Sequence, residues 1–350
     1  MRSSYKKLAL GITVVLPIFA IYYQYSFQMS LQSIRNLNLA AGSFAGRQAI
    51  VVGGTSGIGH GIAVRLAEAN YNVIIVGRDP VRGQSIVDEM KQKSTAKEVH
   101  HQFIPCDAFL LKNVQETTKQ IQSITKDIDV LVLTQGMATI QGRTETKEGI
   151  DQKLALHYFS RMYFIQLLLP QLRSAAAHYQ QQVNSTSSSS GSNSNAWLPP
   201  RVLSVLSAGI HSPFSDYKKD FELKDSYSLP RAADSAGFYN DVMLDAYSKQ
   251  KDNQGITFIH AAPGFVSTNI GNSLPWFVRS LFSGLMIFAR SIYDTAEYMT
   301  VPIFDKKFTG GLYLMNQNGQ EASKTKLHDE AINTVYSKTL EVFQRIEQLQ

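Results

Sequence analysis

The sequence has a single cysteine, Cys106, among 350 residues, which excludes intrachain disulfides and zinc sites built from cysteines. It also lacks a block of basic residues: the net charge is +6, and the basic residues of the N-terminal tail, Arg2, Lys6 and Lys7, are separate from those of the body, so nucleic-acid binding is not expected. With 23 glycines and 11 prolines, the chain is neither collagen-like nor proline-rich, and 44% hydrophobic residues exclude a disordered chain. The length allows two average domains or one large α/β domain.

Charge is absent from the N-terminal run between Leu8 and Ile34. Its first part, LALGITVVLPIFAIYY, is strongly apolar and slightly shorter than the roughly 20 residues that usually span a bilayer. Tyr22, Tyr23 and Tyr25 suit the headgroup level of a membrane. We therefore predict a membrane anchor over residues 1–34, in an intracellular membrane such as the endoplasmic reticulum, with its sidedness open. A cleaved targeting sequence is the alternative.

From Gly46 onward, short apolar runs alternate with helical patterns. Near-continuous Val/Ile/Leu strands separated by helices are typical of a parallel sheet covered on both faces. We therefore predict an α/β fold, a Rossmann-like doubly wound parallel sheet of about seven strands, in a single domain over residues 46–320 followed by a C-terminal helix over 321–350. Strands are expected at 48–54, 72–78, 99–107, 129–136, 201–207, 256–264 and 311–317, and helices at 58–70, 80–93, 110–126 and 149–173.

Two segments depart from this alternation. Residues 180–195, QQQVNSTSSSSGSNSN, hold one apolar side chain and are predicted to form a disordered surface loop. Residues Leu274–Arg290, LPWFVRSLFSGLMIFAR, are apolar nearly all round. This second segment fits a buried core helix, or a lid over an apolar substrate that also rests on a bilayer.

A glycine-rich turn, Gly-Gly-Thr-Ser-Gly-Ile-Gly, follows the first predicted strand and precedes the first predicted helix. Glycines here permit a tight turn and let backbone N–H groups meet a pyrophosphate at the positive end of the helix dipole. The position between a strand and a helix is the context that dinucleotide binding requires. A glycine turn in a domain without cofactor is the alternative. The candidate cofactor-binding residues of this turn are Gly53, Thr55, Ser56, Gly57, Ile58 and Gly59.

The GxxxGxG spacing of this turn resembles the short-chain dehydrogenase/reductase family, and the resemblance extends over about residues 46–320. It implies a cation after the second strand that suits the 2′-phosphate of NADP, an aspartate at the adenine, a glycine after the fourth strand and a PGxVxT segment beside the nicotinamide. We therefore expect NADP, with NAD less favoured, and no metal. The matching residues are Arg78, Asp107, Gly136, Pro263, Gly264, Val266 and Thr268.

The resemblance also implies a catalytic serine, tyrosine and lysine, with an asparagine from the preceding helix. Ser207 matches the serine, and His157 stands where the asparagine is usual. The literal Tyr-x-x-x-Lys pair is Tyr247 and Lys251. Only eight residues separate Tyr247 from Ile256, too few for a helix that crosses the sheet at 1.5 Å per residue, so we place this tyrosine far from the nicotinamide.

Counting back from the sixth strand puts the family's tyrosine near Ala233 and its lysine near Gly237, and neither residue can do the chemistry. Tyr227 and Arg231 keep the four-residue spacing a few positions earlier. The arginine would supply the cation, with a geometry different from that of lysine. The predicted catalytic set is therefore Ser207, Tyr227 and Arg231. The alternative is an ordinary loop tyrosine beside an ordinary loop arginine.

Two functions remain open. The first is an NADP-dependent short-chain oxidoreductase at a membrane, which transfers hydride between the nicotinamide and an apolar alcohol or carbonyl compound. The second is a catalytically impaired NADP-binding sensor or scaffold. The missing lysine favours the second, whereas Ser207 and the PGxVxT segment favour the first, which we prefer. A homo-oligomer is compatible with the sequence.

Overall fold

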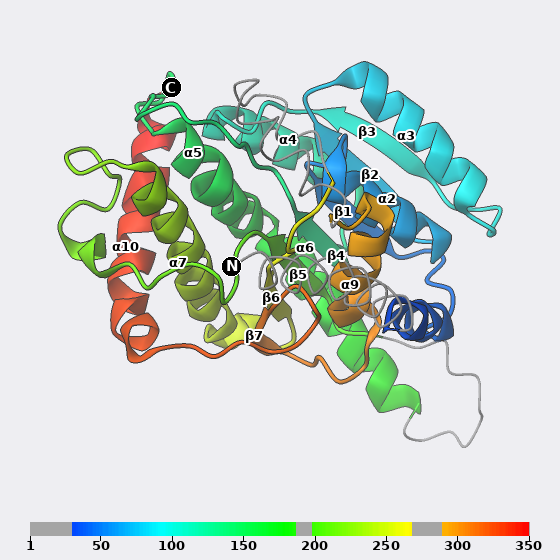
Figure 1. Cartoon of the computed structure of the whole chain (residues 1–350). Helices are drawn as coiled ribbons and strands as arrows, with labels where there is room; N and C mark the ends of the chain where they lie inside the picture. The colour runs from blue at the N-terminus through cyan, green and yellow to red at the C-terminus, as the bar shows by residue number, and fades with distance from the viewer. Residues whose placement is uncertain (1–29, 187–197, 268–288, 350) are drawn as a thin grey trace, which may run out of the picture.

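The computed structural model describes residues 30–186, 198–267 and 289–349 (Figure 1). At its centre is one parallel sheet in the order β3-β2-β1-β4-β5-β6-β7. The chain reverses its direction of travel between β1 and β4, so the sheet is doubly wound, as the sequence predicts. The strands are β1 (Gln48–Val52), β2 (Asn72–Gly77), β3 (His101–Pro105), β4 (Val130–Leu133), β5 (Arg201–Val205), β6 (Thr257–Ala261) and β7 (Gly311–Met315).

Helices cover both faces of the sheet. In β1, Ile50 and Val52 face one core, which α4, α6, α7 and α10 cover. Ala49 and Val51 face the other, which α2, α3 and α9 cover, because successive strand side chains point to opposite faces. The helices are α2 (Gly57–Glu68), α3 (Pro80–Lys93), α4 (Leu111–Ile124), α5 (Gln152–Leu154), α6 (Ser160–Thr186), α7 (Leu229–Ser248), α9 (Ile292–Phe304) and α10 (Lys326–Gln348).

Helix α6 is longer than the sequence predicts. It runs on through residues 180–186, into the segment expected to be a loop. The glutamines there are good helix formers, and an exposed helix end needs no apolar side chains. The polar composition of residues 180–186 is therefore compatible with both a solvated helix end and a loop, and does not distinguish them. The remainder of the predicted loop lies in residues 187–197, outside the described part of the chain.

The N-terminal prediction falls mostly outside the described residues, which begin at residue 30. Residues 30–40 form a helix that packs on α9, with Leu31 buried in the core, so the last part of the predicted anchor, residues 30–34, belongs to the folded domain instead. Arg35 Nη2 lies 2.7 Å from Asp294 Oδ1, and Asn38 Nδ2 donates to Glu297 Oε2 at 2.6 Å. Across the described ranges, no helix combines the length and apolarity needed to cross a bilayer.

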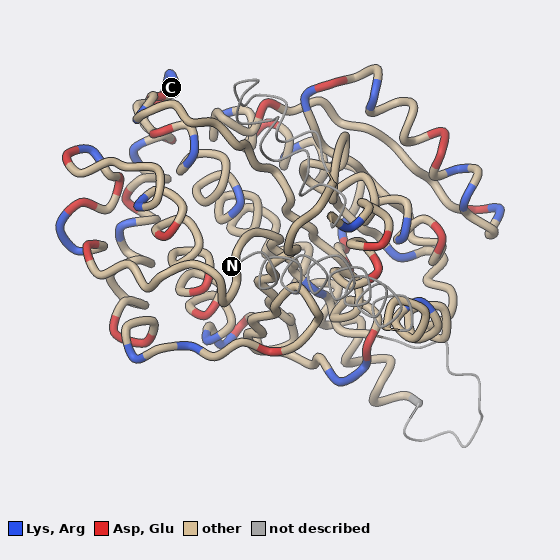
Figure 2. Tube along the Cα trace, viewed as in Figure 1, with Lys and Arg blue, Asp and Glu red and all other residues tan. Residues whose placement is uncertain are grey.

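The charged side chains lie on the outer helices and loops, with both signs interspersed (Figure 2). Charged residues are nearly absent from the sheet itself, and Arg201 in β5 is an exception. Its buried guanidinium donates at 3.0 Å to the carbonyl oxygens of Asp305 and Phe308, which anchors the chain after α9 to the sheet. Along the Cα trace of the described residues in Figure 2, Lys and Arg positions are interspersed with Asp and Glu positions.

Helix α10 completes the core over α7 and α4. Val335, Val342 and Phe343 are buried and belong to the same hydrophobic cluster as the strands. We predict that Phe343→Ala lowers the free energy of unfolding by about 3–5 kcal/mol because it leaves a cavity. Its exposed neighbour offers the control, Gln344→Ala, which should change stability by less than about 0.5 kcal/mol. Denaturant unfolding measures both, and equal stabilities would show that α10 is not part of the cooperative core.

Candidate active site

A cavity of about 500 Å³ opens where β1, β2 and β4 end, at the point where the strand order reverses. This is the place at which open α/β sheets bind nucleotides, and the volume lies in the usual range for ligand pockets. Eight of the predicted cofactor residues line it together: Gly53, Thr55, Ser56, Gly57, Ile58, Gly59, Arg78 and Gly136.

The glycines of the turn are required by geometry. Gly53 has a φ of +84° and Gly57 a φ of +56°, a backbone region that favours glycine. At Gly59 a Cβ atom would stand 2.4 Å from both the carbonyl oxygen of Gly53 and Oγ1 of Thr134. The turn can therefore pack against β4 only without these side chains, which leaves backbone at the surface of the cavity.

Helix α2 begins at Gly57 with its N-terminus at this cavity. The N-cap residue, Ser56, is extended, and no side chain of the described residues caps the first turn. The first N–H groups of a helix have no partner within the helix and carry a partial positive charge. They fit a pyrophosphate, as the glycine motif predicts.

Two arginines stand at the end of β2. Arg78 and Arg82 both line the cavity, and the Arg78 guanidinium lies 5.3 Å from the centroid of the Phe109 ring. Asp79, the residue after Arg78, is the N-cap of α3, and its Oδ1 accepts a hydrogen bond from the backbone N–H of Arg82 at 3.0 Å. Asp107 is exposed, and its Oδ1 accepts from the N–H of Phe109 at 3.3 Å. The sequence reasoning missed Arg82, which lies in the first turn of α3, four residues after Arg78.

His157 holds the end of β4 in place. Its Nε2 accepts a hydrogen bond from the N–H of Met137 at 2.8 Å. Burial, followed by the charge of Arg161, lowers the pKa of His157 to about 3, so the ring is neutral and can accept. It lies in a π-helical turn, Ala155–Phe159, whose His157 carbonyl accepts from Asn240 Nδ2 at 3.0 Å. The residue predicted in place of asparagine thus positions the backbone beside Gly136.

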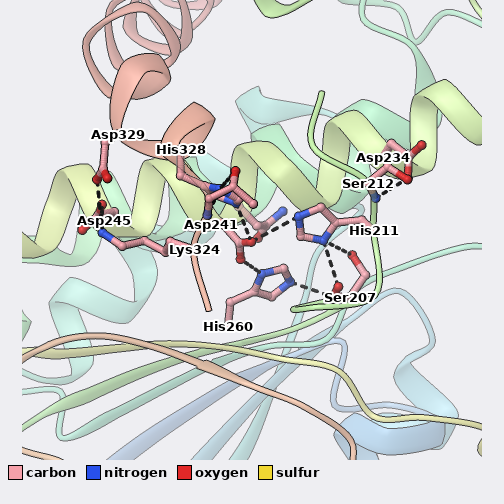
Figure 3. A network of polar contacts seen from close by, with 12 residues as sticks. Ser207, His211, Ser212, Asp234, Asp241, Asp245, His260, Lys324, His328 and Asp329 are labelled. Carbon is pink, nitrogen blue, oxygen red and sulfur yellow. Dashed lines mark hydrogen bonds and ion pairs between the residues drawn. The ribbon is translucent and has the colours of Figure 1, made fainter. Parts of the chain in front are cut away.

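Ser207 lies two residues beyond β5, at the edge of the sheet where the cavity opens. Its N–H donates to His260 Nε2 at 3.1 Å, and its Oγ lies 3.4 Å from His211 Nδ1. Both rings contact Asp241, which also meets His328 (Figure 3). Sequence reasoning missed this cluster, because its members come from a loop, α7, β6 and α10. The one local signal is His211, four residues after Ser207.

Three members of the cluster come close enough together to be compared with a metal site. One atom each of His211, Asp241 and His328 lies within 4.8 Å of the others. Each ring already donates to the Asp241 carboxylate, at 3.1 Å from His211 and 3.2 Å from His328. These hydrogen bonds account for the close approach of the three residues.

Tyr227 lies two residues before α7, and its hydroxyl is buried without a hydrogen-bond partner among the described residues. Burial, followed by the charge of Asp151, raises the pKa of Tyr227 to about 12. Arg231 is turned to other partners: its Nη2 donates to Asp216 Oδ2 at 2.8 Å and to Ser226 Oγ at 3.0 Å. The structure therefore does not bring the arginine to the tyrosine hydroxyl.

The remaining candidates lie at other places. Tyr247 is in the last turn of α7, and its buried hydroxyl donates to the Met162 carbonyl at 3.2 Å. The segment after β6 lies at the same sheet edge as Ser207 but not in the wall of the cavity. There Gly264 has a φ of +73°, and Val266 pairs with Arg290. Pro263 begins this segment, whereas Thr268 and most of the predicted lid fall in residues 268–288, outside the described part.

The family model described as short chain dehydrogenase matches residues 47–200. Oxidoreductase AN1596 of Emericella nidulans is 31% identical over 264 residues, which cover 74% of this chain and 70% of that protein. The chain belongs to the short-chain dehydrogenase/reductase family. Family membership and these relatives indicate an NAD(P)-dependent oxidoreductase.

Further similarities support the fold. Human polyprenol dehydrogenase is 23% identical, and the match covers 85% of this chain and 84% of that protein. A short-chain dehydrogenase from Sphingobium yanoikuyae, solved with NADPH, superposes with a TM-score of 0.51 at 16% identity, over 76% of this chain and 87% of that one. The chain spans about two thirds of the length of the fungal relatives that it matches.

We predict that Gly59→Ala weakens NADPH binding by more than about tenfold, because the added Cβ would push the turn away from Thr134 and β4. Isothermal titration or fluorescence measures the dissociation constant. Gly142→Ala is the matched control, since nothing lies within 4 Å of a Cβ at that glycine, and its affinity should be unchanged. Wild-type affinity in Gly59→Ala would show that the turn does not form the cofactor site.

Proposed function

We propose that the protein is an NADP-dependent oxidoreductase that interconverts an apolar alcohol and its carbonyl compound. The observation that carries this proposal is the cavity at the switch point, with a glycine turn on one side and two arginines on the other. Ser207 supplies a hydroxyl at the same edge of the sheet, where a carbonyl oxygen beside the nicotinamide would accept its hydrogen bond.

The preference for NADP rests on the charges at the end of β2. A 2′-phosphate needs cations, and arginine binds phosphate with two parallel N–H donors. Arg78 and Arg82 both reach the cavity. NAD instead needs an acid that accepts from the ribose hydroxyls, and the nearest candidate, Asp79, is occupied as the cap of α3 and as the partner of Arg82 at 3.4 Å.

We therefore expect NADPH to bind at least about tenfold tighter than NADH, a difference of roughly 1.4 kcal/mol. Arg78→Asp should narrow or reverse this gap, because it replaces the cation with an acceptor for the ribose hydroxyls. Titration of each variant with both cofactors measures the ratio. Lys97→Asp makes the same charge change at an exposed position distant from the cavity and should preserve it. Equal affinities in the unmodified protein would contradict the assignment.

An apolar substrate is supported by two observations. The similarity to polyprenol dehydrogenase points to an enzyme of long isoprenoid alcohols. The sequence also contains two strongly apolar segments, LALGITVVLPIFAIYY near the N-terminus and Leu274–Arg290, either of which would bring the protein to a membrane in which such alcohols dissolve. We propose a membrane-associated enzyme, at an intracellular membrane such as the endoplasmic reticulum, on this basis.

Ser207→Ala should lower turnover at least about 100-fold while NADPH binding persists, because the variant loses a hydrogen-bond donor to the carbonyl oxygen. NADPH oxidation with a panel of prenals and other apolar carbonyl compounds measures this change. Tyr247→Phe is the control: its hydroxyl donates to the Met162 carbonyl at 3.2 Å, in the last turn of α7, and turnover should stay near normal. A Ser207→Ala variant with full activity would remove Ser207 from the reaction.

One observation favours a second function. Ala233 and Gly237 occupy the places of the family's tyrosine and lysine, so the protein could bind the cofactor without turning over. Tyr227 remains the proton donor proposed from the sequence, and the cluster around Asp241 offers another. NADPH binding without oxidation by any carbonyl compound of the panel would establish the sensor or scaffold.

A further inference from the structure

Asp241 is a buried carboxylate at the centre of three histidines. Its side chain is 2% exposed, and those of His211, His260 and His328 are 4%, 0% and 5% exposed. Figure 3 shows the rings converging on Asp241 from a loop after β5, from β6 and from α10. Ser207 lies at the edge of the same cluster. A buried charge of this kind needs donors on all sides, so the hydrogen-bond partners determine where the protons lie.

His260 is neutral in this arrangement. Its Nε2 faces the N–H of Ser207 at 3.1 Å, which can only donate, so this nitrogen is the acceptor and carries no proton. Its Nδ1 therefore carries the single proton and donates it to Asp241 Oδ1. Burial lowers the pKa of His260 despite the adjacent carboxylate, which agrees with the neutral ring.

His328 is neutral for the same reason. Its Nδ1 accepts from the N–H of Thr325 at 3.0 Å, at the start of α10. Its Nε2 then holds the single proton and donates to Asp241 Oδ2 at 3.2 Å. Both of these histidines thus give one N–H to the carboxylate and accept one from the backbone.

His211 differs from the other two because both of its nitrogens face acceptors. Nδ1 lies 2.8 Å from the carbonyl oxygen of Ser207, and Nε2 lies 3.1 Å from Asp241 Oδ2. Neither of these oxygens can donate, whereas the Ser207 hydroxyl, 3.4 Å from Nδ1, is a longer contact that can either donate or accept. The two shorter contacts are both satisfied only when each nitrogen carries a proton, so we assign the ring as an imidazolium. Burial acts to lower the pKa of His211, but the hydrogen bond to Asp241 and its charge outweigh burial, and the net pKa is raised above 6.5.

The position of His211 depends on the glycine at the place of the family's lysine. A Cβ atom at Gly237 would come within 2.4 Å of Ser207 Oγ and 2.6 Å of Cγ and Nδ1 of His211. Any side chain there would displace the imidazole ring. A lysine at position 237 and the His211 ring beside Ser207 therefore exclude each other, because both would occupy the same space.

We propose that His211, held as an imidazolium by Asp241, supplies the proton for carbonyl reduction through the hydroxyl of Ser207, in place of the family's tyrosine and lysine. This inference rests on the oxidoreductase function proposed above. Ser207 touches the substrate, and His211 and Asp241 act through it. Tyr227 is a weaker source of the proton, because burial raises its pKa to about 12 although the charge of Arg143 acts to lower it. Lys153 Nζ lies 5.7 Å from the centroid of its ring, but the hydroxyl has no hydrogen-bond partner among the described residues.

In the direction of reduction, NADPH held at the glycine turn would supply the hydride, with its electron pair, to the carbonyl carbon. The carbonyl oxygen takes the Oγ proton of Ser207, and Ser207 takes the Nδ1 proton of His211, which becomes neutral and keeps its Nε2–H on Asp241. His211 regains a proton from solvent, and oxidation of the alcohol is the reverse. The Oγ to Nδ1 distance of 3.4 Å has to shorten when substrate binds, which is common for catalytic hydrogen bonds.

The serine, histidine and aspartate do not form a hydrolase triad. In a triad the histidine nitrogen near the serine must accept the hydroxyl proton. Here the Nδ1 nitrogen of His211 starts with a proton and donates it to the Ser207 carbonyl at 2.8 Å, so in this state it cannot take the hydroxyl proton. The cluster is therefore arranged to deliver a proton and not to activate a nucleophile.

The pH dependence follows from the groups that face His211. Asp241 on α7 contacts it, Asp234 on α7 binds the N–H of the next residue, Ser212, at 2.9 Å, and the neutral His260 and His328 complete the surroundings. Negative charge predominates, so the imidazolium persists above the ordinary pKa of histidine. The reduction rate should be constant at lower pH and fall about tenfold per pH unit above the raised pKa.

The test is the pH profile of kcat for NADPH-dependent carbonyl reduction by the full chain between pH 5.5 and 10. We expect a descending limb above pH 6.5 in the unmodified protein and in Tyr227→Phe. His211→Gln should lower kcat at least about 100-fold at pH 7 and abolish the limb. A pH-independent rate in the unmodified protein, or an unchanged limb in His211→Gln, overturns the relay and leaves Tyr227 as donor.

The matched control is His328→Gln, which alters a ring at the same carboxylate oxygen but does not contact Ser207. Its profile should keep the descending limb, and loss of the limb would overturn the specific role of His211. NADPH affinity and the thermal midpoint show whether each variant folds.

A measurement without variants or turnover completes the test. In ¹⁵N-histidine NMR of the NADPH-bound protein at pH 7, both nitrogens of His211 should be protonated, and His260 and His328 should each carry one proton. A neutral His211 overturns the relay whatever the activity. Hydride transfer with a neutral His211 overturns the relay alone, whereas an imidazolium without any hydride transfer overturns the proposed function and the relay together.

Discussion

The buried carboxylate of Asp241 is the constraint on which the substrate side of this molecule depends. An ionised group out of water is stable only when several donors surround it. Here those donors are three imidazole rings, from the loop after β5, from β6 and from α10. The carboxylate therefore ties α7 to the sheet and to the C-terminal helix, and orients Ser207 through the His260 ring. Loss of the Asp241 charge would loosen all of these elements together.

The cofactor side depends on a different constraint, which is close contact between backbones. The turn at Gly53 and Gly59 packs directly against Thr134, with no room for a Cβ atom. This contact places the N-terminus of α2 and the end of β4 on two sides of one cavity. Among the described residues that line the cavity, the charged ones are Arg78, just after β2, and Arg82, in the first turn of α3. Asp79, between them, caps α3. The residues proposed to bind the pyrophosphate and the residues proposed to select NADP therefore lie on separate short segments of the chain.

In the proposed relay, a chain with Ala233 and Gly237 at the positions counted for the family's tyrosine and lysine still holds a proton beside the substrate. Gly237 removes the side chain that would fill the space next to Ser207, and the His211 ring occupies it. The family's tyrosine needs a lysine to lower its pKa. A histidine carries a transferable proton at neutral pH without a lysine, provided that an anion stabilises the imidazolium. Asp241 provides that anion.

The sequence by itself determined the parallel sheet, its seven strands and the glycine turn, because a short contiguous sequence pattern predicts each of them. Strand runs, helix periodicity and glycine spacing are local, and the six residues named from the glycine turn line one cavity together with Arg78 and Gly136, which the family resemblance implied. It also placed Ser207 at a strand end and Tyr247 far from that cavity. The extension of α6 to Thr186 escaped it, since an exposed helix end and a loop have the same polar composition.

Only the tertiary structure decided which side chains meet at Ser207. Arg231 keeps the right spacing from Tyr227, yet Asp216 and Ser226 hold its guanidinium elsewhere. Asp241, His260 and His328 are far apart along the chain, and no spacing rule connects them to His211. Their hydrogen bonds form because α7 and α10 pack over the carboxyl ends of β5 and β6, and a buried charge then selects its donors by distance in space and not by position in the sequence.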